Sequence, residues 1–146
     1  MVRRRESNSG QDLVEYAIVF PVLMLLLLGI IDFGRIIYSY NAISNAAREG
    51  TRLAILPSSR KDLEEAIGLS PEVRCHPAPG NVIIQRVCDR ALALSRNALQ
   101  VTVSQPGLDI VQVEVVYEGP FLTNIILQAV KRDSLRLEAA ATMRLE

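Results

Sequence analysis

Histidine and cysteine are scarce in this chain, and neither charge is in excess. His76 is the only histidine, and Cys75 and Cys88 are the only cysteines. These side chains offer a metal at most three soft ligands, whereas a structural zinc site normally has four. Basic and acidic residues balance at 16 each, without a basic stripe. The sequence therefore predicts no metal, no cofactor and no nucleic-acid partner.

Groups that would carry catalysis are also missing. The sequence has no phosphate-binding loop, and its lone histidine stands among prolines, where such a side chain is usually just solvated. Glu64 and Glu65 are neighbours on a predicted helix, so they point in different directions and make a poor acid–base pair. We expect no catalytic residue. An anchored hydrolase is the weakest of three functional hypotheses.

The sequence does contain one long apolar run near its N-terminus. No charged residue occurs from Ala17 to Ile31, and residues 13–31 would cover about 28 Å as a helix, close to a bilayer core of ~30 Å. A signal-peptide core is shorter, and the small-x-small cleavage site that should follow it is missing here. Arg3, Arg4 and Arg5 precede the run, and a basic arm of this kind stays in the cytoplasm. We expect a single-pass protein of the cytoplasmic (inner) membrane, with its N-terminus inside and everything after the run outside.

The helical pattern continues beyond the membrane. Apolar and small residues recur three or four positions apart on one predicted helix face: Ile36, Tyr40, Ile43, Ala47, Gly50 and Ala54. The polar complement is Asn41, Asn45, Arg48, Glu49 and Arg52. Pro57 ends the pattern. We therefore expect one helix from about residue 11 to residue 56, apolar all round in its first half and amphipathic in its second.

The middle of the chain carries two shorter predicted helices and both cysteines. A capped helix is expected after Ser59 and a second one after Asn81, with a proline-containing loop over 68–80 between them. Cys75 lies in that loop and Cys88 on the second helix. The oxidising space outside the membrane allows a disulfide, which would contribute about 3 kcal/mol in the chain-entropy model. Two reduced thiols are the alternative.

The C-terminal third changes to a period of two. Apolar and polar residues alternate over 99–104, 111–118 and 135–146, which is typical of half-buried strands. The segment from Gln105 to Gly107 is expected to form the turn between the first two strands. One face of this sheet needs cover, and the amphipathic half of the long helix can provide it. The predicted fold class is α+β: a long N-terminal helix, half transmembrane and half amphipathic, packed on a small antiparallel sheet.

Three segments resemble the TadE-like pseudopilins of tight-adherence (Flp-type) pilus systems. The stretch GQDLVEY matches the prepilin-peptidase motif, in which a glycine (Gly10) and four variable residues precede Glu15 and Tyr16. The following run, VEYAIVFPVLMLLLLGIIDFGR, matches the membrane segment of this family, and NAAREGTR at residues 45–52 matches the next family pattern. The ending MRLE is similar only weakly.

The resemblance implies a type IV pilin-like protein and a role for each motif residue. A prepilin peptidase would cut between Gly10 and Gln11, and the Glu15 carboxylate would then pair with the free Gln11 amine of a neighbouring subunit. Tyr16 belongs to the same processing and assembly motif. The implied domains are a basic leader (1–10), a transmembrane segment (11–31), an amphipathic continuation of the helix (32–56) and an extracytoplasmic α+β domain (57–146).

The predicted function is that of a processed pseudopilin or minor pilin in a tight-adherence-type pilus used for adhesion or surface colonisation. The expected partners are the prepilin peptidase, other pilin or pseudopilin subunits, the pilus assembly machinery and the membrane. The alternative is an extracytoplasmic binding module on an unprocessed single-span anchor. The N-terminal residue of the mature protein distinguishes the two hypotheses.

Overall fold

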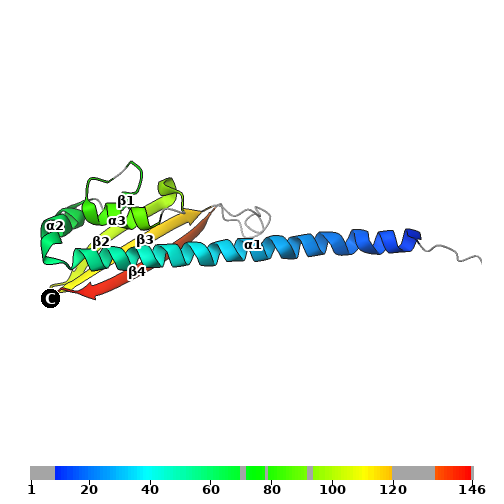
Figure 1. Cartoon of the computed structure of the whole chain (residues 1–146), viewed down its shortest axis with the longest axis horizontal. Helices are drawn as coiled ribbons and strands as arrows, with labels where there is room; N and C mark the ends of the chain where they lie inside the picture. The colour runs from blue at the N-terminus through cyan, green and yellow to red at the C-terminus, as the bar shows by residue number, and fades with distance from the viewer. Residues whose placement is uncertain (1–8, 70–71, 78, 92–93, 120–133, 146) are drawn as a thin grey trace, which may run out of the picture.

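A computed structural model of the chain describes residues 9–69, 72–77, 79–91, 94–119 and 134–145. Its dominant element is the helix α1 (Ser9–Ala54), a single helix of 46 residues that extends well beyond the rest of the molecule (Figure 1). By helical rise it is roughly 70 Å long. The remaining elements form a small head around its C-terminal half. The predicted α+β arrangement of a long helix and a small antiparallel sheet is confirmed.

The sheet has the order β1-β2-β3-β4, and every neighbouring pair is antiparallel. The three predicted strands are β2 (Leu99–Gly107), β3 (Ile110–Gly119) and β4 (Leu135–Arg144). The strand β1 (Val73–Arg74) was not expected, because it lies inside the predicted 68–80 loop and is too short to show alternation. It pairs with the outer edge of β2, with Val73 opposite Val101.

The turn between β2 and β3 is not where the sequence pattern predicts it. Gly107 pairs with Ile110, so Leu108 and Asp109 form a two-residue turn. The residues expected to turn instead belong to the end of β2, where the register shifts between Ser104 and Gly107. A bulge of this kind accommodates a proline that cannot donate a ladder hydrogen bond.

Two short helices complete the head. They are α2 (Arg60–Gly68), which follows the 3-10 turn η1 (Pro57–Ser59), and α3 (Val82–Arg90), which lies beside α1 (Figure 1). A second 3-10 turn, η2 (Arg96–Ala98), leads into β2. The expected cap on α2 is wrong in detail, because the Ser59 side chain makes no capping hydrogen bond.

The predicted cap on α3 is confirmed. Asn81 Oδ1 accepts hydrogen bonds from the backbone N–H groups of Ile83 (3.0 Å) and Ile84 (3.4 Å). The other end of the same amide donates to the Asp62 carbonyl at 2.7 Å. One buried side chain therefore starts α3 and ties it to α2.

The core lies between the sheet and the helix layer of α1 and α3. The inward side chains of β2 and β3 are fully or nearly fully buried, among them Val101, Val113 and Val115. They meet Ile43 of α1 and Val87 of α3 in one continuous apolar cluster. The amphipathic half of α1 thus covers the sheet, as its pattern predicts.

One residue of the predicted helix face is wrong. Tyr40 is 50 % exposed, whereas Ser39 is buried. Taken at 100° per residue, Tyr40 lies at the margin of the buried stripe that Ile43, Ala47 and Ala54 define, so its ring turns to solvent. The spacing alone is compatible with a buried or an exposed Tyr40. Which of the two occurs depends on how wide a strip of α1 the head covers.

Candidate processing and assembly site

The N-terminal turn of α1 holds Gly10 and Gln11. Gly10 is exposed, and a Cβ built on it would meet no atom within 4 Å. The N–H groups of a first helical turn have no acceptor within the helix, so unwinding that turn breaks few hydrogen bonds. The peptide bond between the two residues is therefore uncovered and inexpensive to present in an extended form.

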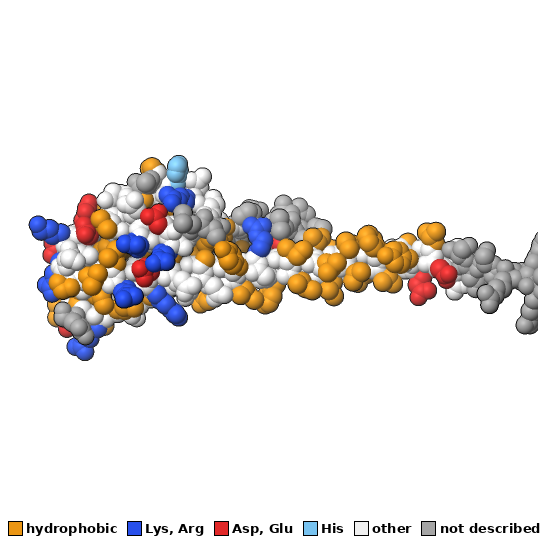
Figure 2. Space-filling view, viewed as in Figure 1, with side chains coloured by type: hydrophobic (Ala, Val, Ile, Leu, Met, Phe, Trp, Pro, Cys, Tyr) orange, Lys and Arg blue, Asp and Glu red, His pale blue; other side chains and the backbone are white. Residues whose placement is uncertain are grey.

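Glu15 and Tyr16 lie one turn further along the same helix. Glu15 is exposed, and Tyr16 is 68 % exposed with its ring stacked on Phe20 at a centroid distance of 6.0 Å. Since Glu15 is four residues after Gln11, the two positions share one side of α1. In Figure 2 acidic side chains gather at the N-terminal end of a stem that is otherwise apolar.

We call residues 10–31 of α1 the stem, because the head does not cover them. Its large apolar side chains are exposed, including Leu13, Ile18, Leu26 and Ile30. By length and composition α1 is able to cross a membrane, and it is the single such helix among the described residues. Water is an unfavourable surrounding for a surface of this size, so the stem requires lipid or other helices around it.

The head grips α1 through small residues, which we call the seam: Ala46, Ala47, Gly50, Thr51 and Ala54, all buried. A Cβ on Gly50 would overlap Val87 of α3 and come within 3.4 Å of Val113 of β3. The Thr51 hydroxyl lies 2.8 Å from the Ala47 carbonyl oxygen and 3.2 Å from that of Ala141, which links α1 to β4. Arg90 of α3 adds an ion pair with Glu49 at 3.5 Å.

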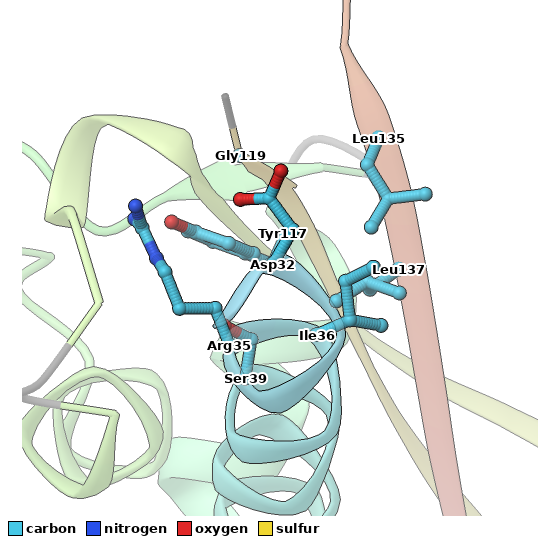
Figure 3. A pocket seen from close by; sticks show the side chains of 8 residues that line it. All are labelled: Asp32, Arg35, Ile36, Ser39, Tyr117, Gly119, Leu135 and Leu137. Carbon is cyan, nitrogen blue, oxygen red and sulfur yellow. The ribbon is translucent and has the colours of Figure 1, made fainter. Parts of the chain in front are cut away.

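A small cavity marks the point where the stem enters the head. From α1 it is lined by Asp32, Arg35, Ile36 and Ser39, and from the sheet by Tyr117, Gly119, Leu135 and Leu137. In Figure 3 the side chains of Asp32, Arg35 and Tyr117 end on one side of it, with the leucines on the other. Asp32 is only 4 % exposed. The first buried residue of α1 is thus a carboxylic acid next to a tyrosine.

Residues 10–52 match the model of the family described as TadE-like protein. Over this segment, which covers less than half of the chain, the protein is similar to that family. No curated protein matches it, and no solved structure does. The family is a structural component of the tight-adherence pilus and is not typically enzymatic, which agrees with the resemblance found in the sequence.

The TadE-like match spans the whole stem and almost all of the seam. It begins at the exposed Gly10 and ends one residue beyond Thr51, whose hydroxyl reaches β4. The family pattern therefore contains both surfaces of α1: the one that the head covers and the one that it leaves bare. The α2–α3 region and the sheet lie outside the match.

Sequence reasoning missed the burial of Asp32. A signal was present, since Asp32 lies four residues before Ile36 and seven before Ser39, on the buried stripe of α1. A charged residue in that stripe is unusual enough to be examined for a tertiary contact. Gly119 also escaped notice, although a Cβ there would overlap the Tyr117 ring that borders the same cavity.

The two cysteines form a disulfide, with Cα atoms 5.6 Å apart. Both are buried, Cys88 on α3 and Cys75 after β1, where its N–H donates to the Leu99 carbonyl at 3.1 Å. The bond pins the edge of the sheet to α3, and this geometry supports the disulfide over two reduced thiols. His76 is exposed, and the described residues contain no group of three His, Cys, Asp or Glu side chains placed to hold a metal.

Proposed function

We propose that this chain is a TadE-like pseudopilin or minor pilin of a tight-adherence pilus, and that a prepilin peptidase cuts it between Gly10 and Gln11. The observation that carries the proposal is an open glycine, followed by Glu15 and Tyr16, at the start of an uncovered apolar stem. The cut removes a leader that contains Arg3, Arg4 and Arg5. Residues 1–8 of that leader lie outside the described residues.

Cleavage creates an amine where assembly needs one. The new N-terminus, Gln11, lies one helical turn before Glu15 on the same side of α1. When stems come together, an unpaired carboxylate surrounded by apolar side chains is costly, and the amine of a neighbouring subunit neutralises it. The pairing also sets the register between stems, because a sliding stem loses it. The role of Tyr16, beside Phe20, is to keep the motif on a regular helix.

The stem has a different partner before and after assembly. In the cytoplasmic membrane, residues 11–31 span the bilayer, with the basic leader inside and residues 32–146 outside. Within a pilus the apolar side chains of other stems replace the lipid. The disulfide between Cys75 and Cys88 agrees with a head in an oxidising compartment.

A minor or priming role suits this chain better than that of the bulk filament subunit. The subunits that make up the filament of Flp-type pili are usually much shorter than a chain of 146 residues. The additional residues form the head. The partners are then other pilins or pseudopilins and the assembly machinery, in a pilus that serves adhesion or surface colonisation.

The mature N-terminus tests this proposal. We expect protein from a host with its prepilin peptidase to begin at Gln11, measured by N-terminal sequencing and intact mass. Gly10→Leu should remain uncut, whereas Gly29→Leu is the matched control, since Gly29 is also a helical glycine with open space around it. A wild-type chain that still begins at Met1 or Val2 would contradict processing and favour the unprocessed anchored binding module.

A further inference from the structure

The helix side of the head is basic. Arg48 and Arg52 are exposed one turn apart on α1, and Arg90 of α3 joins them in lining a shallow hollow. Glu49 is the single acidic residue among the described residues that line the hollow, and these carry more positive than negative charge. Figure 2 shows basic side chains gathered over this part of the head. We call Arg48, Arg52 and Arg90 the basic side.

The opposite side of the head is acidic. Even-numbered residues of β3 and β4 point away from α1, because the odd-numbered ones fill the core. This outer face carries Glu114, Glu118 and Glu138 together with Arg136 and Arg144. Arg136 lies opposite Glu118 and pairs with Glu138 at 2.7 Å, and Arg144, at the far end of β4, pairs with Asp109 of the β2–β3 turn at 3.8 Å. Among the described residues of β3 and β4 this face has three carboxylates and two guanidinium groups, and the Asp109 carboxylate offsets the charge of Arg144, so the face is negative. We call Glu114, Glu118 and Glu138 the acidic face.

The two charged surfaces lie on opposite faces of one small head, so a single copy cannot join them. Two copies can, and the pair then retains one free basic side and one free acidic face. Such a contact is heterologous: it places the second copy in one direction relative to the first and differs from a two-fold dimer. Complementary potentials of this kind steer association and fix its register.

The heights of the two surfaces above the stem add a second constraint. Leu137 lies beside the cavity at Asp32–Ser39, whereas Ala141, further along β4, is bonded to Thr51 between the two arginines of α1. Glu138 thus lies about 10 Å nearer the membrane than Thr51 at a strand rise of ~3.3 Å per residue, which is about 5 Å nearer than Arg48 and about 11 Å nearer than Arg52. A neighbour must move outward by about that much to bring its acidic face to the basic side.

The pairing of Gln11 with Glu15 in the stem requires the neighbour to move in the same outward direction as the head contact does. For the Gln11 amine of a neighbour to reach Glu15, that neighbour must move outward by four residues, about 6 Å of helical rise. The two estimates agree in sign and in order of magnitude. Head and stem contacts are therefore compatible within one pair of subunits.

We propose that the basic side of one copy binds the acidic face of a second copy, displaced outward by one to two helical turns. This inference rests on the proposed function for the stem contact. The head contact itself depends only on the two charged surfaces. The predicted partner is another copy of this chain, and salt should weaken the contact because the side chains involved are exposed.

Two charge-reversed forms of the full-length chain test the contact. Arg48→Glu with Arg52→Glu makes both surfaces acidic, and Glu118→Lys with Glu138→Lys makes both basic. We expect each form alone to lose about tenfold in homotypic dimer, measured by cross-linking of two differently tagged copies in membranes. Mixing the two forms should restore the dimer, and every restored dimer should contain one copy of each.

The control is Arg60→Glu with Lys61→Glu, which reverses two exposed charges on α2, away from both surfaces. It should dimerise as the wild type does. Thiol labelling reports the fold of every variant, since folded heads keep the disulfide between Cys75 and Cys88. A wild-type chain that never self-associates, or that binds only a different protein, overturns the inference. So do reversed forms that dimerise alone, or that fold but fail to associate when mixed.

The outcome is independent of processing. The same samples give the mature N-terminus, so a chain that is cut after Gly10 but does not self-associate contradicts only the head contact. An uncut chain whose reversed forms behave as expected contradicts the proposed function and supports the contact.

Discussion

The two halves of α1 are one continuous helix with opposite demands on their side chains. The stem is lined with leucine, isoleucine and phenylalanine that the head leaves exposed. The half that crosses the head buries small side chains, because its backbone must lie close to α3 and the sheet. One helix can therefore bind two different partners along its length. Its large side chains contact lipid or neighbouring subunits, and its small side chains contact its own domain.

The two halves of α1 thus differ in when their contacts form: those of one half form when the chain folds, and those of the other half form when subunits assemble. Contacts at Gly50 and Thr51 are complete within one chain. Those of Glu15 and the stem await a second molecule. Substitutions in the two halves should accordingly affect different measurements, and each variant can sharpen or break that separation.

The largest effect is expected from Glu15→Leu. The change makes the stem more apolar, so membrane insertion should be at least as efficient. It removes the partner of a neighbour's Gln11 amine, and the variant should be processed and inserted but absent from pili. Pilus fractions and membrane fractions are compared by immunoblot. Asp12→Leu removes another exposed carboxylate of the same helix and is the matched control. Normal pili that contain the Glu15→Leu chain would rule out the pairing mechanism.

The disulfide should be the largest single contribution to stability in the head. Replacing Cys75 and Cys88 together by alanine should lower the free energy of unfolding by about 3 kcal/mol in the chain-entropy model. Denaturant titration of the full-length chain in detergent, followed by a head-specific signal, measures this decrease. Reduced wild type should match the double variant. Equal stability of the oxidised and reduced forms would show that the bond constrains nothing that folding does not already fix.

Periodicity made most of the fold predictable, and tertiary position explains the remainder. The long helix and the strands β2, β3 and β4 repeat their patterns often enough to be recognised. The strand β1 is two residues long and forms only because β2 offers an edge. Tyr40 was misplaced and the burial of Asp32 was missed because exposure along a helix face depends on what lies opposite, and at Asp32 that is Tyr117 of β3 and the leucines of β4.

The candidate site was predictable to a different degree in its two parts. Gly10, Gln11, Glu15 and Tyr16 form a local motif, so their positions on one exposed helical segment follow from spacing alone. The role of Gly50 did not, since its proximity to Val87 depends on residues far apart in the sequence. A local motif can be recognised from the sequence alone, whereas a close contact between distant segments can be recognised only once the fold is known.

Gly50→Val should have the next largest effect on the head. The added side chain would overlap Val87 and crowd Val113, and overpacking of this kind typically costs about 1–3 kcal/mol. Denaturant titration measures the destabilisation. Gly34→Val is the control, because Gly34 has open space around it and lies in the same helix. If both variants are equally stable, α3 does not lie against α1 as closely as the structure has it.

The smallest effect is expected from Thr51→Val, which keeps the shape of the side chain and removes its hydroxyl. The variant loses the hydroxyl hydrogen bonds to the Ala47 carbonyl and to the Ala141 carbonyl of β4, which share one proton, while the Ala47 carbonyl can still accept a backbone N–H within the helix. A net hydrogen bond is worth about 0.5–1.5 kcal/mol, and we expect a destabilisation in that range with no change in processing. Thr142→Val is the matched control, since that threonine is exposed on the opposite face of β4. Should Thr51→Val instead abolish pili while the head keeps its stability, the seam would serve assembly as well as folding, and the separation between the two halves of α1 would not hold.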